Sequence, residues 1–321
     1  MTSAKSNKIQ LLRGLAIIAV VFIHNTPDGL AQVFCRPFLN FAVGLFLFLS
    51  GMLSNVNHWN PRKRIIKVAV PYVLWTFIYT ALYNIATPSA LPALFVKKLM
   101  TGGAAAIMYY IFVYCEFTLL IPLIDRLARS KYKYFGLLIS PIEMICMRLI
   151  PLVLGYELNT YIKVILRLSC LSWFTFFYLG YLLGNHIIQI KIPTKRLVGL
   201  WAMAIVLQMA EGYWYLSMGE ANCGTQTKLS CILTGVPFVI MAYRFVSSEK
   251  EYHLKFLKRL GDCSFGIYFS HLAVMAILEK IPYYSQYVFY PLNGVIAVLV
   301  SFAFVLAGGK ILGKFGKYLA L

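Results

Sequence analysis

One segment near the start of the chain, RGLAIIAVVFIH, combines two side chains that can do chemistry, Arg13 and His24. The eleven positions between them, at 100° per residue, bring both to nearly the same helix face, roughly 16 Å apart along the axis. An imidazole can act as a general base toward a hydroxyl, and a guanidinium can bind phosphate. Asp28 could orient the imidazole, although Pro27 disturbs the intervening backbone. The spacing equally allows Arg13 to be a charge that flanks a membrane span and His24 to be an interfacial residue.

A second candidate element is basic: Arg62, Lys63, Arg64 and Lys67 stand at the start of another apolar run. Arg64 and Lys67 are three residues apart, so a helix places them on one face. Such a cluster suits the binding of phosphate groups. Cytoplasmic loops of membrane proteins are also generally rich in Lys and Arg, which explains the cluster without a ligand.

Other ionisable residues interrupt the apolar runs, where inserting a charge costs about 2.5–3.5 kcal/mol. They include Glu116, Glu143, Arg148, Arg167 and His271. Glu143 and Arg148 are five residues apart, too far round an α-helix to pair, so each is expected to find partners on other helices. Glu116 could support acid–base chemistry, but a structural pairing is the simpler interpretation. His271 fits a structural and a functional role equally well.

The composition indicates which elements must position these residues. Of the 321 residues, 60% are hydrophobic and 13% are charged, whereas soluble domains have about 25% charged residues. We therefore expect one all-α membrane domain over residues 1–321, a bundle of about ten transmembrane helices of roughly 20 residues each. The apolar runs lie at 9–26, 36–54, 66–87, 106–124, 134–155, 164–185, 197–216, 229–246, 262–281 and 291–312.

The distribution of charge predicts the orientation of this bundle. Most of the 30 Lys and Arg residues fall in alternate loops, which places the N- and C-termini in the cytoplasm by the positive-inside rule. The net charge of +19 does not indicate nucleic-acid binding, because the cations lie in short clusters between apolar runs. Membrane lipid is the expected partner. The first run lacks a small-residue cleavage site and is expected to be a retained span.

The seven cysteines do not indicate a metal site, because they form no CxxC pair and no Cys/His cluster with ligand spacing. Most lie in apolar runs, where cysteine behaves as a small hydrophobic residue. Cys223 and Cys231 flank a loop expected outside the cell, where a disulfide is allowed but not indicated by the sequence.

Several further segments follow the Arg13–His24 helix in a characteristic order. They are GLFLFLSGMLS (Gly44 to Ser54), RKRIIKVAVPYVLW (Arg62 to Trp75), YYIFVYCEFTLLIPLI (Tyr109 to Ile124), WFTFFYLGYLLG and CSFGIYFSHLAV, the last with a Tyr-x-x-His pattern. Together with a first helix in which His follows Arg after ten residues, this ordered set resembles the membrane acyltransferase family 3 over nearly the whole chain.

The resemblance implies an O-acyltransferase of the cell (inner, cytoplasmic) membrane. Such enzymes transfer an acyl group, usually acetyl, from cytoplasmic acyl-CoA to a hydroxyl of a cell-surface glycan. His24 would be the catalytic base or acyl-handling residue, with Arg13 as its partner on the first helix. Arg64 and Lys67 match the family's Arg-x-x-Arg element, which is associated with acyl-CoA binding. Lys at the second position keeps the charge but loses the bidentate phosphate geometry of Arg.

Two other classes of function remain open from the sequence. A transporter or flippase could use Arg13, Glu116, Glu143 and His271 as a polar path, although no internal repeat is evident. A non-catalytic acyltransferase-like domain could keep the fold and serve as a substrate-uptake or structural unit.

Overall fold

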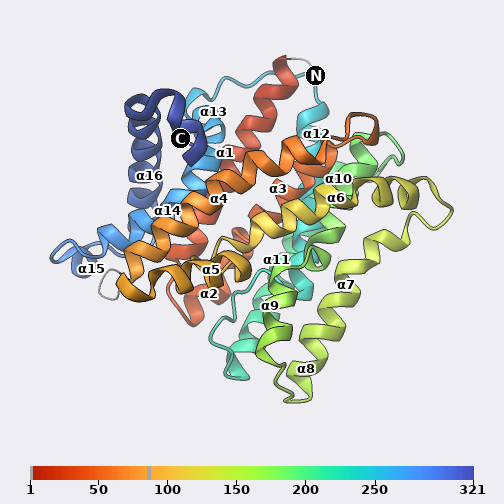
Figure 1. Ribbon diagram of the computed structural model, residues 1–321. Coiled ribbons are helices and arrows are strands. Elements are labelled where there is room, and N and C mark those ends of the chain that lie inside the picture. Colours follow the sequence, from red (N-terminus) through yellow and green to blue (C-terminus); the bar gives the residue numbers. More distant parts are fainter. Residues whose placement is uncertain (1–2, 85–87) are drawn as a thin grey trace.

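The computed structural model describes residues 3–84 and 88–321, and all regular structure in these ranges is helical (Figure 1). Seven helical segments are long and apolar enough to cross a membrane, and two bent helix pairs raise this number to nine. The seven are α1 (Ser3–Asn25), α2–α3 (Leu30–Met52), α4 (Pro61–Tyr83), α7–α8 (Phe135–Val153), α11 (Thr194–Ser217), α12 (Leu229–Ser247) and α16 with its 3-10 extension (Leu292–Leu319). The bent pairs are α9 (Thr160–Leu168) with Leu171–Gly184, and α13 (Lys255–Asp262) with α14 (Ser264–Leu278).

One predicted span has a helix that does not meet this standard. The run 106–124 corresponds to α6 (Tyr109–Arg129), which carries Glu116, Asp125 and Arg126 and is too charged to be counted. The last residues of the predicted span 66–87, namely 85–87, lie outside the described residues. Within the described ranges the fold is thus a multi-helix bundle with seven to nine candidate spans, and the figure of ten stays a prediction.

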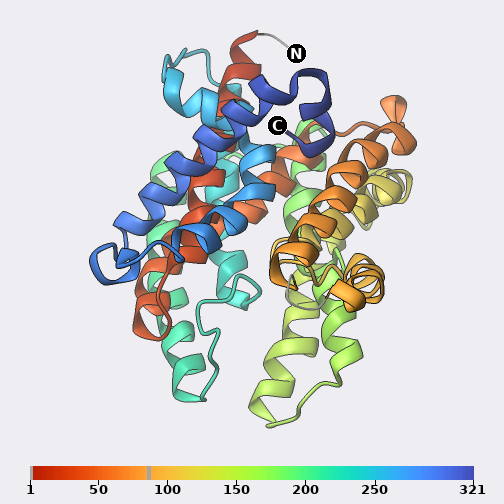
Figure 2. The same ribbon diagram turned by 60° about the vertical axis from the view of Figure 1, so that its left-hand side comes forward.

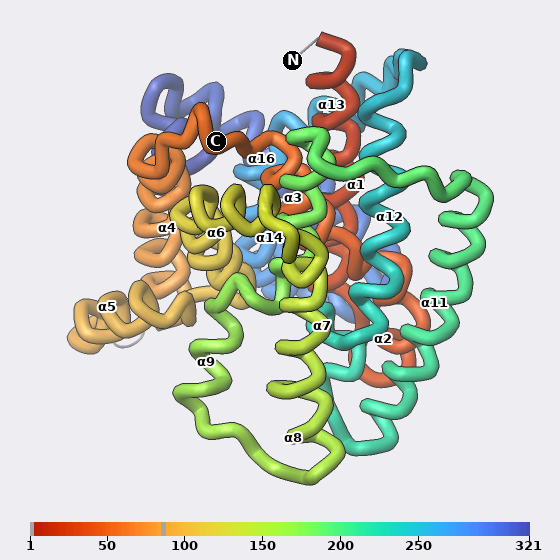
Figure 3. Tube along the Cα trace, turned by 90° about the vertical axis from the view of Figure 1, so that its right-hand side faces the viewer, coloured from red at the N-terminus to blue at the C-terminus, as the bar shows by residue number. Residues whose placement is uncertain are grey.

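The two chain ends lie at the same end of this bundle. Figure 2 shows the N- and C-termini together, with the turns that follow α8 (Ile150–Val153) and α11 at the opposite end. One short helix, α5 (Leu91–Thr101), lies across the bundle and projects from it in Figure 3. An even number of membrane crossings brings both ends of a chain to one side.

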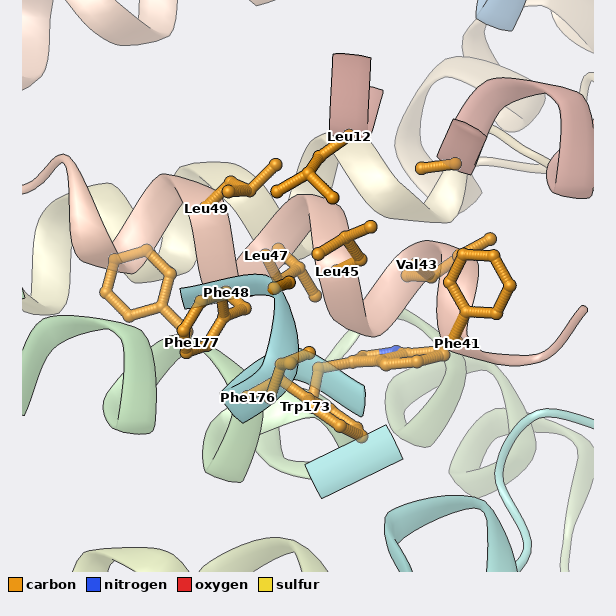
Figure 4. Close-up of a cluster of buried hydrophobic side chains, with 14 of the residues drawn as sticks. Leu12, Phe41, Val43, Leu45, Leu47, Phe48, Leu49, Trp173, Phe176 and Phe177 are labelled. Atoms are coloured by element: carbon orange, nitrogen blue, oxygen red, sulfur yellow. The ribbon is translucent and has the colours of Figure 1, made fainter. Parts of the chain in front are cut away.

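The core lies where α3 (Phe41–Met52) crosses α10 (Phe174–Gly184). Both helices are apolar around almost their whole circumference, which is the pattern of a fully surrounded helix. Figure 4 shows Phe48 of α3 against Phe177 of α10, and Phe177 also stacks on Phe117 with ring centroids 4.3 Å apart. This dry centre fixes the helices that surround it, including α1 and α12.

Close approach of α3 and α10 depends on glycine. A Cβ added at Gly180 would lie 2.1 Å from the carbonyl oxygen of Phe48, and one at Gly51 would lie 2.0 Å from that of Phe177. Gly180 and Gly184 form a GxxxG pattern, which allows two helix backbones to touch in a membrane.

We expect Gly180→Ala to lower the free energy of unfolding by about 1–3 kcal/mol, because the new methyl group must push the α3 backbone away. The measurement is the thermal unfolding temperature of the detergent-solubilised protein. Gly199→Ala in α11 is the matched control, since its added Cβ would have no neighbour within 4 Å. Equal unfolding temperatures for the two variants would contradict this account of the α3–α10 contact.

A change of helix type brings one unexpected pair together. Glu143 in α7 (Ile139–Met144) and Arg148 in a π-helical turn (Ile145–Leu149) form an ion pair, with Arg148 Nη2 3.4 Å from Glu143 Oε1. The expectation that each would pair only with other helices was wrong, because it assumed 3.6 residues per turn. In a π-turn residues five apart come into register. Arg148 also donates a hydrogen bond of 2.9 Å to Ser172 Oγ in the turn Leu171–Trp173.

Candidate active site

The first helix brings Arg13 and His24 to one cavity. Helix α1 runs without a break from Ser3 to Asn25, so the sequence spacing translates directly into a shared face. Both side chains line the same cavity of about 570 Å³. Arg13 lies roughly 16 Å before His24 along the helix axis, so the two groups serve different parts of that cavity.

Two of the cations of α4, Arg64 and Lys67, line this same cavity. Asn60 caps the helix by accepting a hydrogen bond of 3.0 Å from the Lys63 amide, and Pro61 occupies its first turn. Arg64 and Lys67 then face the cavity, whereas Arg62 and Lys63 are exposed and do not line it. The Arg64 guanidinium is oriented by donating a hydrogen bond of 3.0 Å to Ser54 Oγ.

Tyrosines form the wall between these cations and His24. Tyr109, Tyr110 and Tyr114 come from α6, and Tyr268 comes from α14. The rings of Tyr110 and Tyr268 lie 5.5 Å apart and are tilted at 56°. Such a wall can bury an uncharged, flexible chain while offering hydroxyl groups for hydrogen bonds.

His271 lies beside His24, with ring centroids 5.3 Å apart. It is fully buried on α14 and does not line the cavity. Its Nδ1 is 3.0 Å from the carbonyl oxygen of Ile267, which fits an Nδ1–H donor, and its Nε2 has no partner within the described residues. The structure therefore brings His271 to the site as a neighbour of His24.

The other ionisable residues singled out from the sequence have structural partners. Glu116 Oε2 accepts a hydrogen bond of 2.6 Å from the Cys170 amide, and Arg167 Nη2 donates one of 2.8 Å to the carbonyl oxygen of Thr101. Neither Glu116 nor Glu143 lines the cavity. The polar path that a transporter would need through these two residues and Arg13 is therefore not continuous in this cavity.

Gln226 and Lys317 are among the lining residues that sequence reasoning missed. Gln226, in the loop between α11 and α12, lines the cavity and leaves its Oε1 without a hydrogen-bond partner in the described ranges. A lone Gln in a loop carries no sequence signal for such a position. Lys317 also lines the cavity, although in the sequence it is indistinguishable from the nearby basic residues Lys310 and Lys314.

Lys317 reaches the cavity because the C-terminal segment folds back over the bundle. Its 3-10 helix, Gly313–Leu319, is held by a hydrogen bond of 2.9 Å from Trp75 Nε1 to the carbonyl oxygen of Leu319. Ala320 then packs so closely on Gly266 that an added Cβ there would lie 2.6 Å from its carbonyl oxygen. The cavity thus has four basic side chains, from α1, α4 and this segment, and one acidic one, Asp262.

The cysteines make no covalent bond in the structure. All seven are free thiols, and Cys223 and Cys231 are both buried, so the disulfide that the sequence allowed is not formed. Cys231 Sγ instead accepts hydrogen bonds from the side chains of Gln208 and Asn40. No group of three or more His, Cys, Asp or Glu residues within the described ranges is arranged to hold a metal ion.

Comparison with known proteins identifies the family of the chain. The family model described as an acyltransferase domain matches residues 6–310, nearly the whole chain. No curated protein and no solved structure matches the chain significantly. With a match of that length, the chain belongs to acyltransferase family 3 and is a multi-pass membrane protein.

Proposed function

We propose that this acyltransferase transfers an acetyl group from cytoplasmic acetyl-CoA to a hydroxyl of a cell-envelope glycan. The observation that carries the proposal is a single cavity lined by Arg13, Arg64 and Lys67 and also by His24. A nucleotide donor needs cations for its phosphates, and acyl transfer to a hydroxyl needs a base. The acetyl group and the glycan acceptor follow from the family resemblance described above.

The donor would lie along the cavity from the cations to His24. Its phosphates would contact Arg64, Lys67 and Arg13, and its uncharged arm would extend past Tyr110 and Tyr268. Arg13 is too far from His24 to contact the same atoms, since ten residues of helix separate them. We therefore assign Arg13 to donor binding and keep the catalytic role for His24.

In the transfer step, His24 would take the proton of the acceptor hydroxyl. The hydroxyl oxygen then bonds to the carbonyl carbon of the thioester, the carbon–sulfur bond breaks, and the thiolate leaves with coenzyme A. The proton held on His24 passes to that sulfur, which restores the neutral imidazole. His271 supports this cycle by packing against the His24 ring at 5.3 Å and limiting its movement.

This function requires a fixed orientation in the inner membrane. We propose that the end of the bundle carrying both termini faces the cytoplasm, as the positive-inside rule predicts. Ten crossings would satisfy the shared position of the termini, with charged α6 as the additional span, whose exposed Leu119 and Leu123 would then face lipid. Lys317 and the start of α4 would then meet the donor on the cytoplasmic side.

The test is to incubate the purified protein with acetyl-CoA that carries a labelled acetyl group, and to measure binding and release of coenzyme A. Binding, followed by transfer or slow hydrolysis, is the expected result. Absence of acetyl-CoA binding by a folded preparation would overturn the donor proposal. Long-chain acyl-CoA in a parallel sample tests the preference for acetyl.

The structure adds a prediction for Lys317. We expect Lys317→Gln to weaken acetyl-CoA binding a few-fold, because an exposed charge contributes about 1 kcal/mol or less to an ion pair. The measurement is the Kd from titration calorimetry at low salt. Lys314→Gln is the matched control, since Lys314 is exposed on the same segment but does not line the cavity. Equal losses in both variants would indicate only a general effect of charge.

A further inference from the structure

A second cavity, of about 250 Å³, lies beyond the histidine pair and has no role in the function described so far. Residues of three elements line it: the end of α1, the end of α14, and the segment from α15 (Tyr284–Tyr287) to the start of α16 (Leu292–Leu312). They are Asn25, Pro27, Met275, Leu278, Glu279, Tyr284, Ser285, Val288, Phe289, Tyr290, Asn293 and Ala297.

The two cavities follow one another along the same pair of helices. On α1, Val20 and His24 line the large cavity and Asn25 lines the small one. On α14, Tyr268 lines the large cavity and Met275, one turn after His271, lines the small one. Asn25 Nδ2 contacts Met275 Sδ at 3.4 Å, so the two helices run in parallel register here. The contact of His24 with His271 therefore lies between the two cavities.

The small cavity has a different charge from the large one. No Lys or Arg lines it, and Glu279 at its rim has no ion pair within residues 3–84 and 88–321. A polyanionic nucleotide would be repelled there, whereas the large cavity carries four cations. The ligand of the small cavity should thus not be a polyanion, and it should differ from the donor.

The lining is suited to a sugar. Tyr284, Phe289 and Tyr290 offer aromatic faces on which the C–H groups of a pyranose ring can stack. Glu279, Asn293 and Ser285 offer hydrogen-bond groups for its hydroxyls. A cavity that combines apolar faces with a few polar groups is the usual form of a small-molecule site.

We propose that this second cavity binds the acceptor, a neutral sugar unit of a glycan, beside Asn25, the chain neighbour of His24. This inference rests on the proposed function. It adds that donor and acceptor occupy separate cavities on opposite sides of the His24–His271 contact along α1 and α14.

The experiment fills the small cavity and measures donor and acceptor functions separately. Ala297→Phe introduces a ring at a lining position of α16, and Val300→Phe introduces the same ring at an exposed position of that helix that lines neither cavity. Each gene is expressed in the native cell from which the chromosomal copy has been deleted. The alkali-released acetate of the envelope polysaccharide is measured, together with the acetyl-CoA Kd of each purified variant.

We expect Ala297→Phe to lower polysaccharide acetate at least tenfold and to leave the acetyl-CoA Kd within twofold, with Val300→Phe unchanged in both. If cells with Ala297→Phe carry as much polysaccharide acetate as cells with the parental protein, the cavity is not the acceptor site. If the variant loses acetate and also binds acetyl-CoA more weakly, the cavity belongs to the donor. If Ala297→Phe does not fold, Asn293→Ala removes a lining amide without adding bulk and must lower acetate in the same selective way. If the parental protein does not bind acetyl-CoA, the proposed function is wrong. If it binds acetyl-CoA but its cells carry no polysaccharide acetate, only the proposal of a glycan acceptor is wrong.

Discussion

His24→Ala is expected to lower the rate of acyl transfer by about 10²–10⁴-fold, the usual contribution of a general base. His24 lines the large cavity beside His271 and is separated by ten helix residues from Arg13, so removing its ring should not disturb the cations that we propose to bind the donor. The acetyl-CoA Kd should therefore stay within about twofold of the parental value. The measurement is the turnover of labelled acetyl-CoA at saturating donor, alongside the Kd of the same preparation.

His58→Ala is the control for this change, because His58 is exposed on the turn Val56–His58 and lines neither cavity. His24→Gln provides a variant of closer size in case the alanine leaves a hole in α1. A folded His24 variant that transfers acetyl at the parental rate would defeat the proposed mechanism while leaving the family membership intact.

Arg64→Gln is expected to raise the acetyl-CoA Kd by roughly tenfold or more. A hydrogen bond to a charged group contributes about 1.5–3 kcal/mol, and Arg64 is half-buried and oriented by Ser54, so little of this is lost to solvent or disorder. Since Arg64 would contact the donor away from its reacting carbon, turnover at saturating acetyl-CoA should change much less than affinity. The measurement is the Kd together with the kcat and KM of transfer.

Arg62→Gln distinguishes a donor site from a merely topogenic cluster. Arg62 belongs to the same basic run and the same helix turn, but it is exposed and does not line the cavity. We expect the acetyl-CoA Kd of Arg62→Gln to stay close to the parental value at physiological salt. If both variants lose affinity equally, or neither does, the specific role of Arg64 is wrong and the cluster acts only through the positive-inside rule.

The apolar runs predict the positions of the helices well, because burial in lipid requires long uncharged segments. The run 229–246 corresponds closely to α12, Leu229–Ser247. Irregular backbone could not be predicted in this way. The π-turn at Ile145–Leu149 and the bend of 79° between α13 and α14 leave no mark in hydropathy, and α13 itself is too basic to resemble a span.

Some residues of the candidate site could be predicted from the sequence, and others could not. Arg13 and His24 belong to one uninterrupted helix, so their shared face follows from helix geometry alone. Whether Arg64 lies near them depends on how α4 packs, and the family resemblance rather than the spacing connected the two. Gln226 and Lys317 reach the cavity through a loop and a folded-back segment, and contacts between positions so distant in sequence cannot be read from one chain.

If donor and acceptor reach the protein from opposite faces of the bilayer, as we propose, the protein must not become a pore. In the described part of the chain the two cavities share no lining residue, and the imidazoles of His24 and His271 meet between them. The two imidazole rings would then separate the cavities in addition to the chemical role of His24. Water and ions in one cavity would not reach the other during transfer of an acetyl group. Under this arrangement an acetyl group from the cytoplasm could be transferred to a glycan outside the cell without protons leaking across the membrane.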